Sequence, residues 1–282
     1  MDRRTVLQIV ATTLAATGLG CTCARAGFPG LPQQDTETRW VDPSDRPERD
    51  DKSASPEAPA DRDEGLEAGL RDLKVCALTS GQAGRLARTK GFSRASGIPQ
   101  LDGTLNSEPP VLRDLFGVDP GFAFFNDGRA INAYAMPQNI LRRRGDGTVV
   151  FGRNLLRTEI AKASQLMRGP NAWATAVIGI FAHEWGHIRQ FSDVGQLDKP
   201  LMELHADYLA GWYLGTKSSY GSSLDIAGIA RSLYEKGDSN FNSPPDHGRP
   251  IQRVKSMEAG FLLGRRRAPV SDAFRAGLDA LS

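Results

Sequence analysis

Cysteine is scarce in this 282-residue sequence, which contains three cysteines. Cys21 and Cys23 lie close together near the start, and Cys76 is the one cysteine in the long remainder. A framework of disulfide bonds needs several cysteines that can pair, so none is predicted. Cys76 is expected to be a small buried apolar residue.

An excess of charge of one sign is also missing, and no internal repeat is visible. Lys and Arg number 35 against 33 Asp and Glu, which gives a formal net charge of +2. A dedicated nucleic-acid binder would carry clustered and dominant basic residues, so we expect no nucleic-acid partner. With 40% hydrophobic and 24% charged residues, the chain can bury one good core or two small ones.

Long apolar runs are absent as well. The run from Val6 to Gly20 is shorter than the ~18 residues of a membrane-spanning helix. Arg3 and Arg4 precede it, which is the layout of a signal peptide, and residues 1–26 are therefore expected to direct export. The arginine pair also resembles a twin-arginine export signal. An ordinary signal whose two basic residues are adjacent explains the pair equally well.

Two candidate processing sites follow the apolar run. Gly18-Leu-Gly-Cys21 resembles a lipoprotein box, in which a lipidated Cys21 would attach the protein to a membrane, although Gly18 replaces the usual aliphatic residue. Ala24-Arg-Ala26 is an Ala-x-Ala site for soluble release. We slightly favour the lipoprotein, because residues 27–64 are polar, Pro-rich and suited to a disordered tether; a tail without an anchor is the alternative. Both place the protein outside the cytoplasm, in the periplasm or cell envelope.

The domain predicted over residues 65–282 contains the pattern His-Glu-x-x-His at His183, Glu184 and His187. Residues four apart share one face of a helix, so the two imidazoles can converge on one metal ion, for which Zn²⁺ is the best match. Glu184 points off that face and is the candidate general base for a water molecule. Two partnered histidines on a helix, without a metal, are the alternative.

A second helical stretch, Leu201–Tyr213, carries Glu203 and Asp207 four residues apart. Glu203 can complete a metal site of two histidines and one glutamate, and Asp207 can hold a ligand imidazole in one tautomer. A solvated acidic face would explain the pair otherwise, but the rest of the stretch is apolar. His205 lies on another face of this helix and is a poor candidate ligand.

A metzincin would need a glycine three residues and a histidine six residues after His187. Gln190 and Asp193 occupy those positions, so Glu203 is the preferred third ligand.

These motifs resemble those of gluzincin-type zinc metallopeptidases, especially the M48 family and the bacterial neutral zinc metallopeptidases. Ile131-Asn-Ala-Tyr-Ala-Met-Pro137 is similar to the substrate-binding edge strand of M48 enzymes, and Asp246–Arg253 is similar to a later segment that contains a histidine. The resemblance covers roughly residues 110 to 263. It implies a zincin-like domain in which Asn132 and Ala133 contact the peptide.

The resemblance also places His247 where a donor to the developing oxyanion is needed. A residue that braces the last helix would explain His247 equally well, and Arg253 is a weaker candidate for the same role.

Apolar periodicity and turn signals predict an α+β fold, a small sheet packed on several helices. The expected strands are Phe122–Phe125, Ala130–Met136 and Thr148–Phe151, and the expected helices are a short one from Leu66, Val111–Phe116, 153–168, a metal helix through His187, Leu201–Tyr213, Leu224–Tyr234 and Pro250–Leu263. The arginines at 142–144 are expected to form a solvated turn.

The function expected from these features is cleavage of extended or unfolded polypeptides by a zinc endopeptidase, with the substrate paired to the edge strand. The rival is a zinc-bound envelope chaperone or assembly factor that does not cleave. Glu184 argues against this rival, because a binding protein has no need of a carboxylate beside the ligands.

Overall fold

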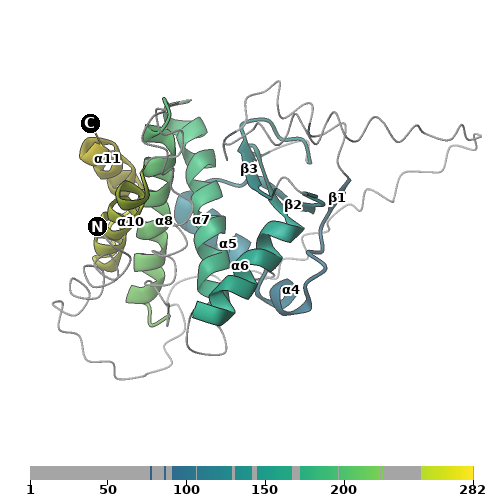
Figure 1. The fold of residues 1–282 in the computed structure, drawn as a ribbon. Coiled ribbons are helices and arrows are strands. Elements are labelled where there is room, and N and C mark those ends of the chain that lie inside the picture. Colours follow the sequence, from purple (N-terminus) through teal and green to yellow (C-terminus); the bar gives the residue numbers. More distant parts are fainter. Residues whose placement is uncertain are drawn as a thin grey trace, which may run out of the picture.

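A computed structural model describes residues 77, 86, 91–105, 107–128, 131–141, 145–166, 172–195, 197–222, 224 and 249–281. These residues form an α+β structure in which a small mixed sheet lies beside a group of helices (Figure 1). The elements are β1 (Phe92–Ser93), α4 (Pro99–Leu105), α5 (Glu108–Phe116), β2 (Gly121–Phe125), β3 (Ala133–Met136), β4 (Thr148–Gly152), α6 (Arg153–Leu166), α7 (Ala172–Asp193), α8 (Leu201–Ser219), α10 (Pro250–Arg265) and α11 (Val270–Leu281).

The four strands are ordered β1-β2-β4-β3. The central pair β2 and β4 is parallel, and each outer strand is antiparallel to its neighbour. Successive side chains of a strand point to opposite faces, and here both faces are buried. Val149 and Phe151 join the main core with the helices, whereas Val150 joins a smaller core with Tyr134 and Leu86. The sheet is therefore enclosed on both sides.

The connection from β4 to α6 has no intervening loop, and Asp127 stabilises it. The buried Asp127 carboxylate accepts hydrogen bonds from the backbone N–H groups of Asn154 and Leu155, at 2.8 and 2.9 Å. These groups belong to the first turn of α6, where N–H groups lack partners within the helix and negative charge is favourable. Asp127 thus ties the end of β2 to the start of the helix.

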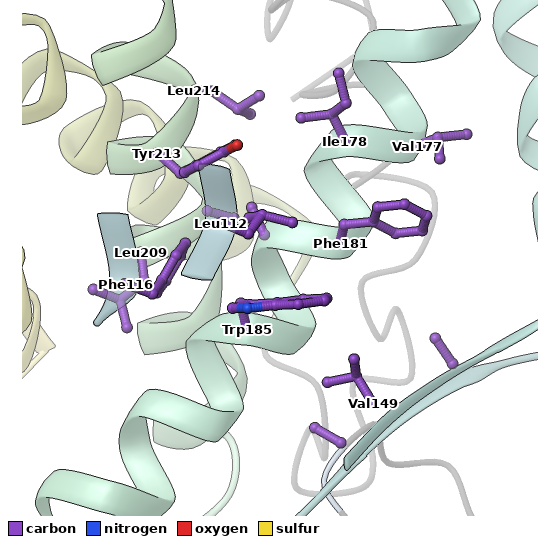
Figure 2. Close-up of a cluster of buried hydrophobic side chains, with 14 of the residues drawn as sticks. Leu112, Phe116, Val149, Val177, Ile178, Phe181, Trp185, Leu209, Tyr213 and Leu214 are labelled. Carbon is purple, nitrogen blue, oxygen red and sulfur yellow. The ribbon is translucent and has the colours of Figure 1, made fainter. Parts of the chain in front are cut away.

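Helix α7 lies between the sheet and α8 (Figure 1). Its Phe181 and Trp185 belong to the same buried hydrophobic cluster as Val149 of the sheet and as side chains of α5 and α8, several of which Figure 2 shows. Helix α8 also packs against α10 and α11, and its residues from Met202 to Thr216 are all buried. The residues predicted to bind a metal are therefore placed on two helices that neighbouring elements contact on several sides.

Glycines bring α8 and α10 into backbone contact. Gly211 and Gly215 of α8 face the backbone of Met257 and Phe261, and Gly260 and Gly264 of α10 face the backbone of Tyr208 and Trp212. A Cβ atom at any of these four glycines would collide with a carbonyl oxygen. Small residues at such spacing allow helices to approach closely. This close approach lets the Arg253 side chain of α10 reach Asp207 of α8.

The coarse α+β prediction is confirmed, and eight predicted elements lie close to β2, β3, β4, α5, α6, α7, α8 and α10. The strand predicted from Ala130 is shorter in the structure and begins at Ala133. Strand β1 and helices α4 and α11 were not predicted. The predicted signal and tether, the helix from Leu66, Cys76, the arginines at 142–144, His247 and, apart from Leu224, the helix predicted at Leu224–Tyr234 lie outside the described residues. Across the part of the chain described here, no helix is both long and apolar enough to cross a membrane.

Candidate metal centre

Helices α7 and α8 bring His183, His187 and Glu203 together. The two imidazole Nε2 atoms are 3.1 Å apart. The Glu203 carboxylate places Oε2 at 3.3 Å from Nε2 of His183 and Oε1 at 3.6 Å from Nε2 of His187. One candidate ligand atom from each residue lies within 4.8 Å of the other two, so this buried group could hold a metal ion.

All three side chains are withdrawn from water. His187 and Glu203 have no exposed surface, and His183 keeps 6% of its surface exposed. Burial lowers the pKa of His187 to about 4; the Glu203 carboxylate opposes this shift, and His183 adds to it. His187 is therefore a neutral imidazole near pH 7, which is the protonation state that a metal ligand requires.

The tautomer of His183 follows from its partner. Its Nδ1 lies 2.9 Å from Oδ1 of Asp207, and the Asp207 carboxylate also accepts two hydrogen bonds from Arg253, at 2.6 and 2.8 Å. Burial raises the pKa of Asp207, but Arg253 and His183 outweigh burial, so the net pKa lies below the ordinary value. An ionised carboxylate only accepts hydrogen bonds. Nδ1 of His183 therefore carries a proton, and in the neutral ring that a metal ligand requires, Nε2 presents its lone pair to the cluster.

The tautomer of His187 follows in the same way from Gln190. The Gln190 Nε2 amide donates to the carbonyl oxygen of Met202 at 2.8 Å, which fixes the orientation of the amide. Its Oε1 then lies 2.9 Å from Nδ1 of His187, so that Nδ1 must be the donor. The Nε2 atom of His187 is thus a lone-pair acceptor, like that of His183.

Two imidazole lone pairs and one carboxylate therefore converge on the same point. Lone-pair nitrogens 3.1 Å apart repel each other unless a proton or a metal cation lies between them. A metal cation bound by both nitrogens and by the Glu203 carboxylate would remove this repulsion. The chemistry of the three donors thus fits a divalent cation.

The other predicted site residues are placed as follows. Glu184 is buried on α7 directly after His183 in sequence. Ala133 begins β3, which packs against α7, and the carbonyl oxygen of Asn132 accepts a backbone hydrogen bond from Gly152 at 3.0 Å. His247 lies outside the described residues.

The outer edge of β3 is partly paired within the chain. Strand β3 ends the sheet order, with β4 on its inner side. On the other side, Ala77 forms a parallel bridge with Ala135. The edge predicted to bind an extended peptide therefore already has one backbone neighbour near its centre.

Gln190 contacts a candidate ligand and Arg253 contacts Asp207, and neither residue was predicted to do so. Gln190 was interpreted as the absence of a metzincin glycine, although its position three residues after His187 places both on one helix face. Arg253 was considered as an oxyanion donor, and the structure instead places it against Asp207. No sequence spacing indicates that contact, because 46 residues separate the pair.

Comparisons with known proteins find no match for this chain. A scan against protein-family models finds no match. Searches of curated proteins and of solved structures find no significantly similar protein or fold.

Proposed function

We propose that this chain is a zinc-dependent endopeptidase with a zincin-like domain, in which His183, His187 and Glu203 hold Zn²⁺. The observation that carries the proposal is the convergence of two imidazole lone pairs and a carboxylate, within 4.8 Å of one another, on two packed helices. Two histidines and one glutamate are a ligand set of catalytic zinc sites, which keep one position open. Calcium and magnesium prefer sites made of oxygen ligands.

Zinc bound to such a set supplies Lewis acidity and lowers the pKa of water to about 7. Glu184 is the base in this proposal: it takes a proton from the attacking water and passes it to the leaving amine. Its burial beside the ligands strengthens its interaction with developing charge, since the local dielectric constant is low. In this proposal Asp207 keeps the tautomer of His183 fixed.

The proposed substrate is an extended or unfolded polypeptide, bound along the β3 edge near Asn132 and Ala133. Backbone pairing with a strand edge recognises conformation more than sequence. Because Ala77 pairs with Ala135, a substrate would use the remaining part of the edge or displace that bridge.

The proposed location is outside the cytoplasm. The arginine pair and apolar run of residues 1–26 support export, and Cys21 supports a lipid anchor. Cell fractionation tests both: a processed chain should leave the cytoplasm, and Cys21→Ala should release it from membranes if the anchor exists. An unprocessed cytoplasmic chain would contradict the export proposal.

Two variants test the ligand and base roles separately. Glu203→Ala should reduce zinc content, measured by elemental analysis on folded protein, because it removes a ligand. Glu184→Gln should retain zinc while losing hydrolysis of a fluorescence-quenched unfolded polypeptide. Full zinc occupancy in Glu203→Ala would refute the ligand set. A biological function that survives in Glu184→Gln would favour the non-cleaving chaperone.

A further inference from the structure

A buried chain of hydrogen bonds continues from the candidate metal centre to helix α11. Gln190 contacts His187 through Oε1, and its Nε2 lies 3.0 Å from Nδ1 of His205. The Nε2 of His205 lies 2.9 Å from the carbonyl oxygen of Phe274. His187, Gln190 and His205 have no exposed surface, so these contacts are withdrawn from bulk solvent.

The direction of every bond in this chain can be assigned from its two ends. The Phe274 carbonyl can only accept, so Nε2 of His205 carries the proton and Nδ1 of the neutral ring accepts. That acceptor requires the NH₂ group of Gln190, and the carbonyl oxygen of Met202 requires the same group. Both ends therefore give one amide orientation, with Oε1 directed at His187.

The ring of His205 is itself held in place by α11. The Phe274 ring meets it edge-on, with centroids 4.6 Å apart and an interplanar angle of 88°. A Cβ atom at Gly277 would lie 2.6 Å from Cδ2 of His205, so α11 approaches the ring as closely as a glycine permits. Helix α11 thus packs closely against the imidazole, and the hydrogen bonds at its two nitrogens set the orientation of the ring.

We propose that Gln190 is a positioning residue for the ligand His187, and that His205 is a lock that holds the Gln190 amide in its working orientation. This inference rests on the proposed metal site. Reversal of the amide would place NH₂ against Nδ1 of His187 and favour the tautomer whose Nε2 carries a proton, which cannot bind a metal. His205 thus influences the metal centre through two successive hydrogen bonds, without itself binding the metal.

The first measurement is zinc affinity, by competition with a chelator on the 282-residue chain near neutral pH. Gln190→Met removes the polar contacts at similar volume and should weaken zinc binding by ~10–100-fold, as is typical when the partner of a ligand histidine is lost. His205→Phe leaves the amide but removes its lock, so a smaller loss is expected. Ser256→Ala is the matched control, because its hydroxyl donates to the carbonyl oxygen of Leu204 at 2.6 Å rather than to a ligand.

The second measurement is the ring tautomer of His187 in metal-free protein, by ¹⁵N NMR. The sequence has four histidines, so assignment by single substitutions is practical. Wild type should show a proton on Nδ1 alone, whereas Gln190→Met should show a mixture or the Nε2 form. A purely structural glutamine would leave the tautomer unchanged. If Gln190→Met does not fold, the zinc affinity and the His187 tautomer of His205→Phe decide the question, and wild-type values for both would overturn the inference.

Zinc affinity in Gln190→Met equal to that in Ser256→Ala would overturn the inference. So would a wild-type His187 whose Nδ1 carries no proton. A wild-type chain that binds no zinc would instead refute the proposed function, and the metal-free tautomer would still decide whether Gln190 positions the ring.

Discussion

The buried ion pair between Arg253 and Asp207 permits the most quantitative prediction. Its contacts are 2.6 and 2.8 Å long, and the side chains are 5% and 0% exposed. Removing one partner of such a pair leaves an uncompensated buried charge and costs about 3–5 kcal/mol. The His183 ring still donates to Asp207, so we expect Arg253→Met to lower the free energy of unfolding by about 3 kcal/mol, at the low end of that range.

Urea denaturation of the metal-free protein measures this change, provided that the slope m is unchanged. Arg275→Met is the matched control, because Arg275 pairs with Asp272 at 3.2 Å with 72% and 54% of the side chains exposed; an exposed pair contributes about 0–1 kcal/mol. The double variant with Asp207→Asn should lose less than the sum of the single variants. A loss below about 1 kcal/mol in Arg253→Met would refute the assignment of a buried, structurally important pair.

Three further predictions concern stability. Gly260→Ala should lower the free energy of unfolding by about 1–3 kcal/mol in thermal or urea denaturation, because the new methyl group would collide with the backbone of α8. Gly103→Ala is the control, since a Cβ atom there has nothing within 4 Å, and it should be neutral or stabilising. Equal changes in stability in the two variants would contradict the close contact of α8 with α10. Burial lowers the pKa of His187 from 6.5 to about 4, so as the pH falls the unfolded chain is protonated at this residue before the folded protein is. The free energy of unfolding of metal-free protein should therefore decrease below pH 6.5, by about 3 kcal/mol at pH 4. If the urea midpoint of His187→Gln showed the same pH dependence as wild type, the titration of His187 would be excluded as the cause. Burial and Glu108 raise the pKa of Tyr213 well above 10, so the stabilising contribution of its protonated hydroxyl is complete below pH 10 and should diminish at higher pH. Tyr213→Phe should lower the free energy of unfolding by about 1.5–3 kcal/mol near pH 7. If the difference in free energy of unfolding between Tyr213→Phe and wild type did not become smaller above pH 10, the raised pKa would be contradicted.

Local spacing was sufficient to predict much of the candidate centre. The four-residue interval between His183 and His187 specifies one helix face, and the interval between Glu203 and Asp207 does the same on the next helix. Both relations lie within one helix, so the sequence alone reveals them. The contact of Arg253 with Asp207 depends instead on how α10 crosses α8, which a linear pattern does not determine.

The elements that were missed have different physical reasons. Strand β1 has two residues, too few to show a period of two. Helix α4 contains Pro99 and Gly103, which lower its intrinsic helix propensity. Helix α11 does carry apolar residues at helical spacing, including Val270, Ala273 and Phe274, so the helix itself could have been predicted from the sequence. Its packing against His205 could not, because that contact depends on the tertiary structure.

The order of the helices along the chain has a consequence for synthesis. The ligand helices α7 and α8 emerge from the ribosome before α10 and α11, which supply the Arg253 guanidinium and the Phe274 carbonyl. A nascent chain that ends after α8 therefore contains every candidate ligand, yet lacks the groups that compensate Asp207 and hold His205. Since metal binding is coupled to folding, tight binding should arise only after translation has passed α11, so the ion would be acquired by a finished domain.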